Sequence, residues 1–213
     1  MSDPPATPVD DDAVDVAATA ATYAENAPEL VGKYLDFSLF ERHGAAFRDA
    51  LPTPRDRHPR VLDVGCGPGA DTVPMIDAGL DVVGLDLTPA FLHEAREQAP
   101  DARFVRGDMR ALPIAPETFE GLWCSAAFLH LPRSEAVPTL EAFRRALAPD
   151  GAMLLSVMAS ETRDADAVEV PDGRRFTFWH GESIRDRLRE AGFGEVRALG
   201  GEEDWHALLA VRD

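Results

Sequence analysis

The pattern of apolar and polar positions divides the chain into three parts. From residue 60 onward, short apolar runs typical of buried strands alternate with segments whose apolar residues recur every three or four positions, as in amphipathic helices. Strands are expected at RVLDVG from residue 60, DVVGLD from 81, ARFVRGD from 102, within FEGLWCSAAF from 119, AMLLSVM from 152, EVRALG from 195 and WHALLAVRD from 205. This alternation predicts an α/β fold with a doubly wound, mainly parallel sheet covered by helices on both faces.

The residues before this alternation have a different composition. Residues 1–12 are acidic and contain several prolines, which predicts a disordered tail. Residues 13–50 are rich in alanine with scattered aromatic residues, which predicts an N-terminal cap of two or more helices with a break near Pro28. Three prolines in residues 51–59 indicate a linker into the sheet, so one domain is expected over 51–213.

The charge of the chain limits its partners. The 213 residues have a net charge of −17, and Lys33 is the only lysine among the 21 basic residues. An acidic, lysine-poor surface resembles that of proteins from salt-loving cells, where a Debye length of about 3 Å at 1 M salt screens the self-repulsion. Negative charge disfavours a nucleic acid partner, although less strongly in a cell whose proteins are all acidic.

Composition also bears on location and on metals. No apolar run approaches the roughly 20 residues of a membrane span, and the acidic start lacks the basic and apolar regions of a signal peptide. A cytoplasmic protein without a membrane partner is therefore expected. Cys66 and Cys124 are too few for a disulfide framework and lack the spacing of zinc ligands, so both are expected to be buried and no metal site is predicted.

A glycine-rich turn follows the first expected strand of the sheet, in RVLDVGCGPGADT. Gly65, Gly67 and Ala70 match the G-x-G-x-x-G/A pattern of dinucleotide-binding proteins. Asp86 stands 21 residues after the first of these glycines, where that pattern has an acidic residue for ribose hydroxyls. Asp63 does not suit a pyrophosphate, because a nearby carboxylate would repel it by several kcal/mol at an effective dielectric constant of about 20. A cofactor with a cation there, such as S-adenosylmethionine, is favoured over NAD, which the spacing alone does not exclude.

Four stretches, in order, resemble the motifs of the class I S-adenosylmethionine-dependent methyltransferases, of the small-molecule type with a methyltransferase type 11/25-like domain. They are VLDVGCGPG, VVGLDLTPAFLHEAR, FVRGDMRALPIAPETFEGLWCSAAFLHLP and EAFRRALAPDGAMLLSV, and the resemblance covers about residues 20–211. It implies a Rossmann-like sheet of seven strands whose last strand is antiparallel and inserted between the two before it. It also implies S-adenosylmethionine as the cofactor and a small-molecule methyl acceptor.

The resemblance further implies which residues hold the cofactor. Asp63 orients the amino group, Asp86 binds the ribose hydroxyls and Asp108 binds the adenine amino group. Aspartates after strands are also common turn residues, which is the alternative for the last two. Gly65, Gly67 and Gly69 are implied to let the backbone approach the methionine part, and the backbone at Ser125 and Ala126 to hold the ammonium group. Leu87 and Met109 are implied to contact the adenine, and Tyr23 of the cap to close over the cofactor.

Two residues are candidates for contact with the methyl acceptor. His130 follows an expected strand at the mouth of the site, and its unperturbed pKa of about 6.5 would suit a general base. A structural histidine in that loop is the alternative. Trp179 lies in a segment that, in the resembling family, often forms part of the acceptor pocket, and an aromatic residue that clamps the loop is the alternative.

Three other functions remain compatible with parts of the sequence. An RNA methyltransferase acting on tRNA would need arginines gathered at the rim of the site. An NAD-dependent oxidoreductase would use the same glycine turn, but Asp63 and the absence of a Tyr-x-x-x-Lys pair disfavour it. A non-catalytic protein that binds S-adenosylmethionine would share all the cofactor motifs. In-line methyl transfer to a small molecule is the function favoured by the resemblance.

Overall fold

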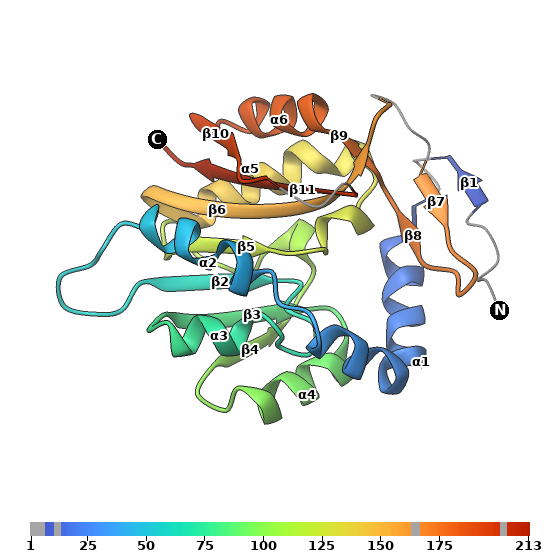
Figure 1. Ribbon diagram of the computed structural model, residues 1–213, viewed down its shortest axis with the longest axis horizontal. Coiled ribbons are helices and arrows are strands. Elements are labelled where there is room, and N and C mark those ends of the chain that lie inside the picture. The colour runs from blue at the N-terminus through green and yellow to red at the C-terminus, as the bar shows by residue number, and fades with distance from the viewer. Residues whose placement is uncertain (1–6, 11–13, 163–166, 201–203) are drawn as a thin grey trace.

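The computed structural model describes residues 7–10, 14–162, 167–200 and 204–213. A sheet of eight strands forms its centre, with the order β10-β11-β6-β5-β2-β3-β4 and with β9 paired to β6 (Figure 1). These strands are β2 (Arg60–Val64), β3 (Asp81–Asp86), β4 (Arg103–Arg106), β5 (Phe119–Cys124), β6 (Leu147–Ser160), β9 (Trp179–His180), β10 (Glu195–Ala198) and β11 (Trp205–Val211). Strands β2 to β6 pair in parallel, which confirms the predicted α/β class.

The last strand of the sheet has the predicted direction and place. β11 pairs antiparallel with β10 on one side and with β6 on the other. Leu208, Leu209 and Ala210 of β11 are buried, because this strand lies inside the sheet with apolar layers on both faces. The Rossmann-like arrangement with an inserted antiparallel strand is therefore confirmed.

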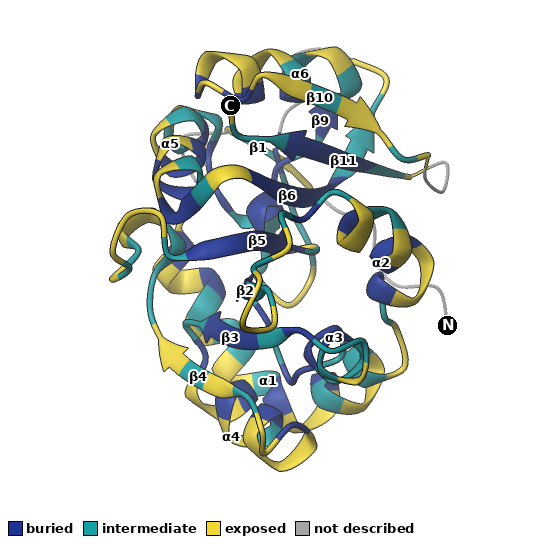
Figure 2. Cartoon of the chain, turned by 90° about the vertical axis from the view of Figure 1, so that its left-hand side faces the viewer, coloured by how far each residue is buried: buried dark blue, intermediate teal, exposed yellow. Residues whose placement is uncertain are grey.

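Helices cover both faces of the sheet (Figure 2). They are α1 (Val16–Leu35), α2 (Phe40–Asp49), α3 (Thr72–Asp77), α4 (Pro89–Gln98), α5 (Ala136–Ala146) and α6 (Gly181–Glu190), with short 3-10 turns η2 (Met109–Ala111), η3 (Phe128–His130) and η4 (Arg133–Glu135). Successive residues of β2 point to opposite faces, so Val61 belongs to a core cluster with residues of α2 and α3, whereas Leu62 and Val64 belong to the cluster that includes residues of α5 and α6. By the same alternation, Asp63 lies on the face of α2 and α3.

The predicted break of the cap at Pro28 is wrong, because α1 continues through that residue. A proline inside a helix costs about 3 kcal/mol, since it removes a hydrogen bond and clashes with the preceding turn. Ala27 and Leu30, on either side of Pro28, are both buried in a cluster with Phe91 of α4. Packing on both sides of the proline therefore holds the helix in one piece.

A second, small sheet accompanies the cap. It has the order β1-β7-β8, with β1 (Thr7–Val9), β7 (Ala167–Glu169) and β8 (Arg175–Phe176) paired antiparallel. β1 lies inside the segment expected to be a disordered tail; residues 1–6 and 11–13 lie outside the described residues. Figure 1 shows this sheet beside α1, at the end of the main sheet where the parallel strands finish. The α1 helix and the small sheet therefore cover the edge at which a doubly wound fold binds ligands.

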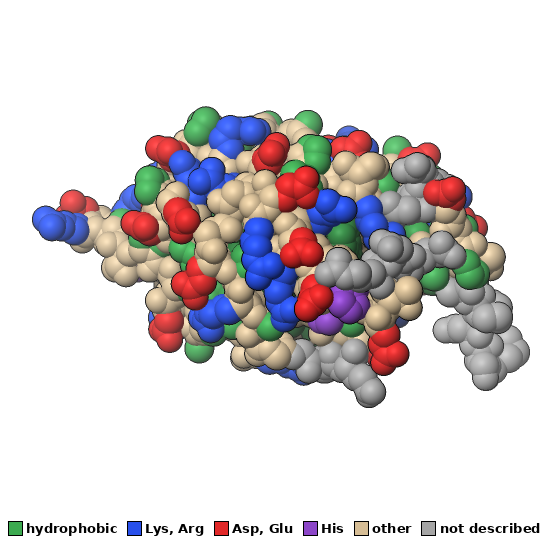
Figure 3. Space-filling model, turned by 90° about the horizontal axis from the view of Figure 1, so that it is seen from above, with side chains coloured by type: hydrophobic (Ala, Val, Ile, Leu, Met, Phe, Trp, Pro, Cys, Tyr) green, Lys and Arg blue, Asp and Glu red, His purple; other side chains and the backbone are tan. Residues whose placement is uncertain are grey.

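Acidic and basic side chains alternate on the surface that carries α6 (Figure 3). Arg187 pairs with Glu190 at 2.7 Å, and Arg189 pairs with Asp186 at 3.1 Å. Exposed pairs of this kind contribute about 0–1 kcal/mol each. Within the described ranges, no helix combines the length and the apolar character needed to cross a membrane.

Candidate functional site

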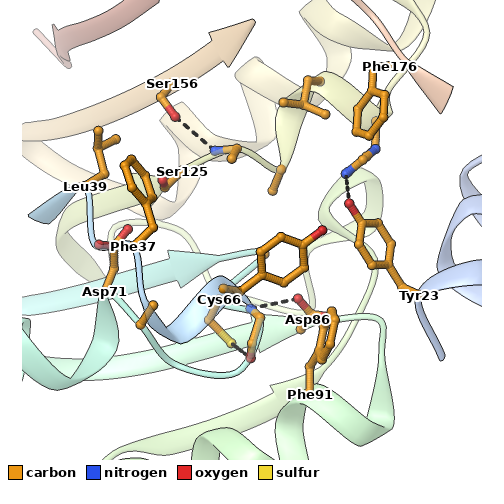
Figure 4. Close-up of a pocket in the computed structure, with 18 of the residues that line it drawn as sticks. Tyr23, Phe37, Leu39, Cys66, Asp71, Asp86, Phe91, Ser125, Ser156 and Phe176 are labelled. Atoms are coloured by element: carbon orange, nitrogen blue, oxygen red, sulfur yellow. Dashed lines mark hydrogen bonds between the residues drawn. The ribbon is translucent and has the colours of Figure 1, made fainter. Parts of the chain in front are cut away.

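A cavity of about 690 Å³ opens at the end of the main sheet where the parallel strands finish. This volume lies within the range of about 300–1,000 Å³ that is typical of small-molecule sites. One wall includes the loops that follow β2, β3 and β5 and residues of β6 and β11, and the other includes α1, the segment before α2, and β7 and β8 with the turn between them (Figure 4). Most of the predicted site residues can therefore be placed against a single cavity.

The turn after β2 brings backbone to this cavity. Gly65, Gly67 and Gly69 have φ angles of +69°, +53° and +99°, which favour glycine. A Cβ on Gly65 would lie 2.2 Å from the Cβ of Ala127, whereas a Cβ on Gly67, which lines the cavity, would meet no protein atom within 4 Å. Gly69 instead packs against Ala95 of α4 and is not part of the cavity wall. Close approach of a ligand to the backbone is therefore possible at Gly67.

Asp86, at the end of β3, is held against the glycine turn. The Gly67 N–H donates to its Oδ2 at 3.0 Å, and the Thr88 N–H donates to its Oδ1 at 2.7 Å (Figure 4). Burial raises the pKa of Asp86, and these two donors partly offset that effect. The carboxylate lines the cavity with lone pairs left over, so it can accept hydrogen bonds from hydroxyl groups of a ligand.

Asp63, in β2, is a buried carboxylate that lines the same wall. It is 2% exposed, and the Thr72 hydroxyl donates to its Oδ2 at 2.6 Å. Burial and the nearby carboxylate of Asp71 raise the pKa of Asp63 to about 8. A positive group placed beside it would favour its ionised form. This wall is therefore suited to a cationic ligand, whose charge would favour the ionised carboxylate, whereas a pyrophosphate would favour the protonated form.

Asp71 is a residue that sequence reasoning missed, and it joins the cap to the sheet. Its Oδ1 accepts hydrogen bonds from the Ser38 hydroxyl at 2.7 Å and the Phe40 N–H at 2.8 Å. Its Oδ2 accepts from the indole N–H of Trp123 at 2.7 Å. These three donors fix the start of α2 against β5, so the position of the cavity wall depends on this one carboxylate.

The predicted backbone and adenine contacts are partly assembled. Ser125, Ala126, Leu87 and Met109 all line the cavity. Ala126 has a φ angle of +51°, and its N–H donates to the Ser156 hydroxyl at 2.9 Å. The N–H of Ala126 is thus already bonded. An ammonium group needs an acceptor such as a carbonyl oxygen, so the contact of this backbone with the ammonium stays a prediction.

Asp108 is placed differently from the other predicted site residues. Its carboxylate accepts from the Arg110 N–H at 2.9 Å and pairs with the Arg110 guanidinium at 2.6 Å. It therefore begins the η2 turn and is not among the residues that line the cavity. A contact of Asp108 with adenine stays a prediction.

Tyr23 of α1 and His130 of η3 meet inside the cavity. The Tyr23 hydroxyl lies 2.9 Å from His130 Nε2, and His130 Nδ1 lies 3.0 Å from the Arg175 carbonyl oxygen. Both residues line the cavity wall. Burial lowers the pKa of His130 to about 4 and raises that of Tyr23. The sequence singled out each residue, but not their contact.

Arg174, in the turn between β7 and β8, brings a positive charge to the cap side of the cavity. Its guanidinium carbon lies 5.2 Å from the centre of the Tyr23 ring and 5.5 Å from that of Phe176. Nη1 donates to the Tyr34 hydroxyl at 2.7 Å, and Nη2 pairs with Asp172 at 2.8 Å. Sequence reasoning missed this group, because residues 161–180 have no apolar period that predicts their neighbours.

Trp179 does not occupy the place expected of it. Its side chain is 1% exposed and packs 6.1 Å from the Phe128 ring, with the Arg133 guanidinium 5.3 Å from its own ring. The neighbouring residues Phe176 and Phe178 line the cavity instead. Among the residues that the structure describes, no cluster of three His, Cys, Asp or Glu could hold a metal ion.

Comparison with known proteins identifies a domain within the chain. Residues 61–151 match the family model of a methyltransferase domain. The chain is 32% identical over 151 residues to the malonyl-[acyl-carrier protein] O-methyltransferase of Enterobacter lignolyticus, covering 70% of this chain and 57% of that protein. It is 34% identical over 103 residues to the demethylmenaquinone methyltransferase of Renibacterium salmoninarum, covering 48% and 43%. The chain thus spans about half the length of these curated relatives.

Solved structures share the fold of the chain. The 1,6-didemethyltoxoflavin-N1-methyltransferase of Burkholderia thailandensis, with bound 1,6-didemethyltoxoflavin and S-adenosylhomocysteine, has a TM-score of 0.72 at 20% identity, covering 100% of this chain and 93% of that one. The PH0226 protein of Pyrococcus horikoshii has a TM-score of 0.66 at 19% identity, covering 82% and 89%. At these identities the likeness concerns the fold alone.

Proposed function

We propose that this chain is a class I S-adenosylmethionine-dependent methyltransferase that transfers the methyl group of S-adenosylmethionine to a small-molecule acceptor, because residues 61–151 match the model of a methyltransferase domain and the curated relatives are methyltransferases. The two curated relatives are named for a malonyl group on acyl carrier protein and for demethylmenaquinone, neither of which is a nucleic acid. The net charge of −17 also supports an acceptor without a phosphate backbone.

The strand-end wall of the cavity fits S-adenosylmethionine group by group. The sulfonium and ammonium groups are cationic, and Asp63 is a buried carboxylate that a cation would stabilise in its ionised form. The ribose hydroxyls are donors, and Asp86 keeps lone pairs to accept from them. Leu87 and Met109 would supply apolar contact for the adenine, and the open space in front of Gly67 admits the ligand close to the backbone.

One observation carries the proposal: a single cavity joins this wall to an apolar chamber under the cap. The chamber, which we call the cap chamber, is lined by aromatic side chains from α1, the segment after α1, α4 and the segment around β8: Tyr23, Tyr34, Phe37, Phe91, Phe176 and Phe178. A second molecule of low mass and apolar character would fit there beside the cofactor. A nucleic acid strand would instead need a basic groove along its phosphates.

Methyl transfer from a sulfonium needs alignment above all, because the sulfur leaves as a neutral thioether. Holding two reactants in line can supply about 7–11 kcal/mol of the barrier. In this chain, Asp86 and the backbone at Gly67 would fix the cofactor end. The rings of the cap chamber would fix the acceptor, and α1 with the small sheet would keep bulk water from the reacting atoms.

The proposal is tested by offering several acceptor classes at once. The protein is incubated with S-adenosylmethionine labelled in its methyl group and a panel of phenols, enols, carboxylic acids, amines and thiols, with total tRNA in a parallel reaction. We expect label in one or more small molecules and none in tRNA, as read by mass spectrometry. Label in tRNA alone would contradict the small-molecule acceptor, and binding of the cofactor without any labelled product would indicate a non-catalytic binder.

A further inference from the structure

The hydrogen bonds around His130 define which of its nitrogens carries a proton. Nδ1 lies 3.0 Å from the carbonyl oxygen of Arg175, and a carbonyl only accepts hydrogen bonds. Nδ1 must therefore be the protonated nitrogen of the neutral ring. Nε2, which lies 2.9 Å from the Tyr23 oxygen, is then an acceptor, and the Tyr23 hydroxyl donates to it. The ring is held in this orientation by Phe176, whose centroid lies 5.1 Å from that of His130.

The surroundings of the pair keep both members neutral. Burial lowers the pKa of His130 to about 4, so its ring carries no charge near pH 7. Burial also raises the pKa of Tyr23, so its hydroxyl does not ionise by itself. The charged and titratable groups packed around them are Arg174, which lies 3.4 Å from the Tyr23 oxygen, the Asp172 partner of that arginine, and Tyr34. The nearby guanidinium would stabilise negative charge developing on the Tyr23 oxygen.

We propose that Tyr23 and His130 form a proton relay for the acceptor, and that the acceptor is methylated on a protic oxygen, such as a phenol or enol hydroxyl. The inference rests on the proposed methyltransferase function and names the acceptor class of the same site. Tyr23 is then a catalytic residue that touches the acceptor, and His130 is the base behind it. Both line the cavity in which the cap chamber meets the strand-end wall, which we call the cofactor wall.

The relay transfers one proton in two steps. The acceptor oxygen forms a bond to the methyl carbon while the bond from that carbon to sulfur breaks, and its electron pair stays on sulfur. The acceptor hydroxyl passes its proton to the Tyr23 oxygen as Tyr23 passes its own proton to His130 Nε2. The imidazolium then loses this proton to water after the products leave. The net products are the methyl ether, S-adenosylhomocysteine and one proton.

A hydroxyl oxygen suits a base as weak as His130. A methylated hydroxyl that kept its proton would be an oxonium, which is a far stronger acid than an imidazolium, so the proton must leave during the transfer. An amine can keep its proton as an ammonium, and a carboxylate has no proton to give near pH 7. A relay that ends on a neutral imidazole is therefore useful for a phenol or enol and superfluous for an amine or a carboxylate.

The test compares Tyr23→Phe and His130→Gln with Tyr34→Phe. Tyr34 is a matched control, since its ring packs 6.2 Å from that of Tyr23 and its hydroxyl accepts from Arg174 rather than donating to His130. The probes are phenols whose ring substituents grade their acidity, with kcat and the KM for S-adenosylmethionine measured for each. Nitrogen NMR of the His130 ring in the resting protein gives a readout that does not depend on turnover.

The relay predicts a loss that depends on the phenol. Tyr23→Phe and His130→Gln should lower kcat by about 10²–10⁴-fold for the least acidic phenols and by less for the more acidic ones, with the KM for S-adenosylmethionine little changed. Tyr34→Phe should give a change that is independent of acidity. In the resting protein, Tyr23→Phe should raise the pKa of His130, because the donor to Nε2 is lost.

Three results would overturn the relay. The first is an equal, acidity-independent loss in Tyr23→Phe and Tyr34→Phe, which would reduce Tyr23 to a packing role. The second is a His130 ring that carries its proton on Nε2 in the resting protein. The third is methylation of amines, thiols or carboxylic acids but of no phenol or enol by a protein that binds S-adenosylmethionine. Failure of the proposed function itself would look different, since calorimetry would then show no binding of S-adenosylmethionine.

Discussion

The Tyr23 hydroxyl lies 2.9 Å from Nε2 of His130, although the two residues stand 107 positions apart in the chain. One belongs to α1 of the cap and the other to the 3-10 turn that follows β5. Their contact joins the cap to the sheet at the wall of the cavity, so both parts contribute to one site.

Asp63 predicts an unusual dependence of stability on pH. Its pKa is about 8 in the folded protein, against an ordinary 3.8, so the folded state binds more protons than the unfolded state between these values. The free energy of unfolding should therefore fall as pH rises from about 4 to 8, by at most about 1.4 kcal/mol per pH unit from this group. Urea unfolding of the ligand-free protein at pH 5, 6 and 7 should show a steeper fall than that of Asp63→Asn. Equal slopes would contradict a raised pKa.

The same carboxylate predicts that cofactor binding releases protons. A cation beside Asp63 favours its ionised form, so the affinity for S-adenosylmethionine should rise between about pH 6 and about pH 7.5. Calorimetry in two buffers of different ionisation enthalpy should show net proton release for the wild type. Asp63→Asn should bind more weakly and release fewer protons. Proton uptake by the wild type would place the cation elsewhere.

Two glycines of the turn should respond differently to alanine. Gly65→Ala combines a φ angle of +69° with a Cβ 2.2 Å from Ala127, so it should destabilise the protein by about 3 kcal/mol or more. Gly67→Ala adds only the strain of its φ angle, about 1–2 kcal/mol, but its Cβ would project into the space kept for the ligand. Urea unfolding and calorimetry together should thus separate a folding defect from a binding defect.

Gly32 gives the control for these two substitutions. It lies in α1, and a Cβ at this position would have no protein atom within 4 Å, so Gly32→Ala should stabilise the protein by about 0.5–1 kcal/mol. Equal losses of stability for Gly65→Ala and Gly67→Ala, with unchanged affinity in the second, would contradict the roles assigned to the turn.

The net charge predicts that salt stabilises the fold. With a charge of −17, self-repulsion opposes the compact state, and added KCl should raise the urea midpoint until the Debye length reaches about 3 Å near 1 M. Exposed ion pairs such as Arg187–Glu190 are weakened by salt, but each contributes little. A midpoint that falls with KCl would show that the ion pairs outweigh the net repulsion.

The sheet and the cofactor wall could be predicted because their signals are local. A buried strand, a glycine turn and a helix follow one another within 18 residues of Arg60, and Asp63 and Asp86 occupy fixed positions in such units. The parallel order of the strands then brings these carboxylates to one edge. No distant contact has to be known for that part of the site.

The cap side could not be predicted in the same way, because it depends on contacts between distant segments. Pro28 argues locally for a break, and burial of its neighbours on α4 overrides that preference. The sequence around Trp179 is compatible with a position in a pocket or in the core, and its packing against Arg133 places it in the core. Arg174 lies in a segment without periodic apolar positions. The pairing of β7 with β8 places its guanidinium over the ring of Tyr23.

In the proposed function, Asp86 anchors S-adenosylmethionine at the end of β3. Calorimetric titration of S-adenosylmethionine and of NAD⁺ in high salt tests it, on the wild type, Asp86→Ala and the control Asp81→Asn at the other end of the same strand. Loss of hydrogen bonds to a charged group costs about 1.5–3 kcal/mol, so Asp86→Ala should weaken S-adenosylmethionine binding by about 10- to 100-fold while Asp81→Asn changes it little, with no binding of NAD⁺. Binding of NAD⁺ instead, or equal affinity for S-adenosylmethionine in all three proteins, would contradict the account.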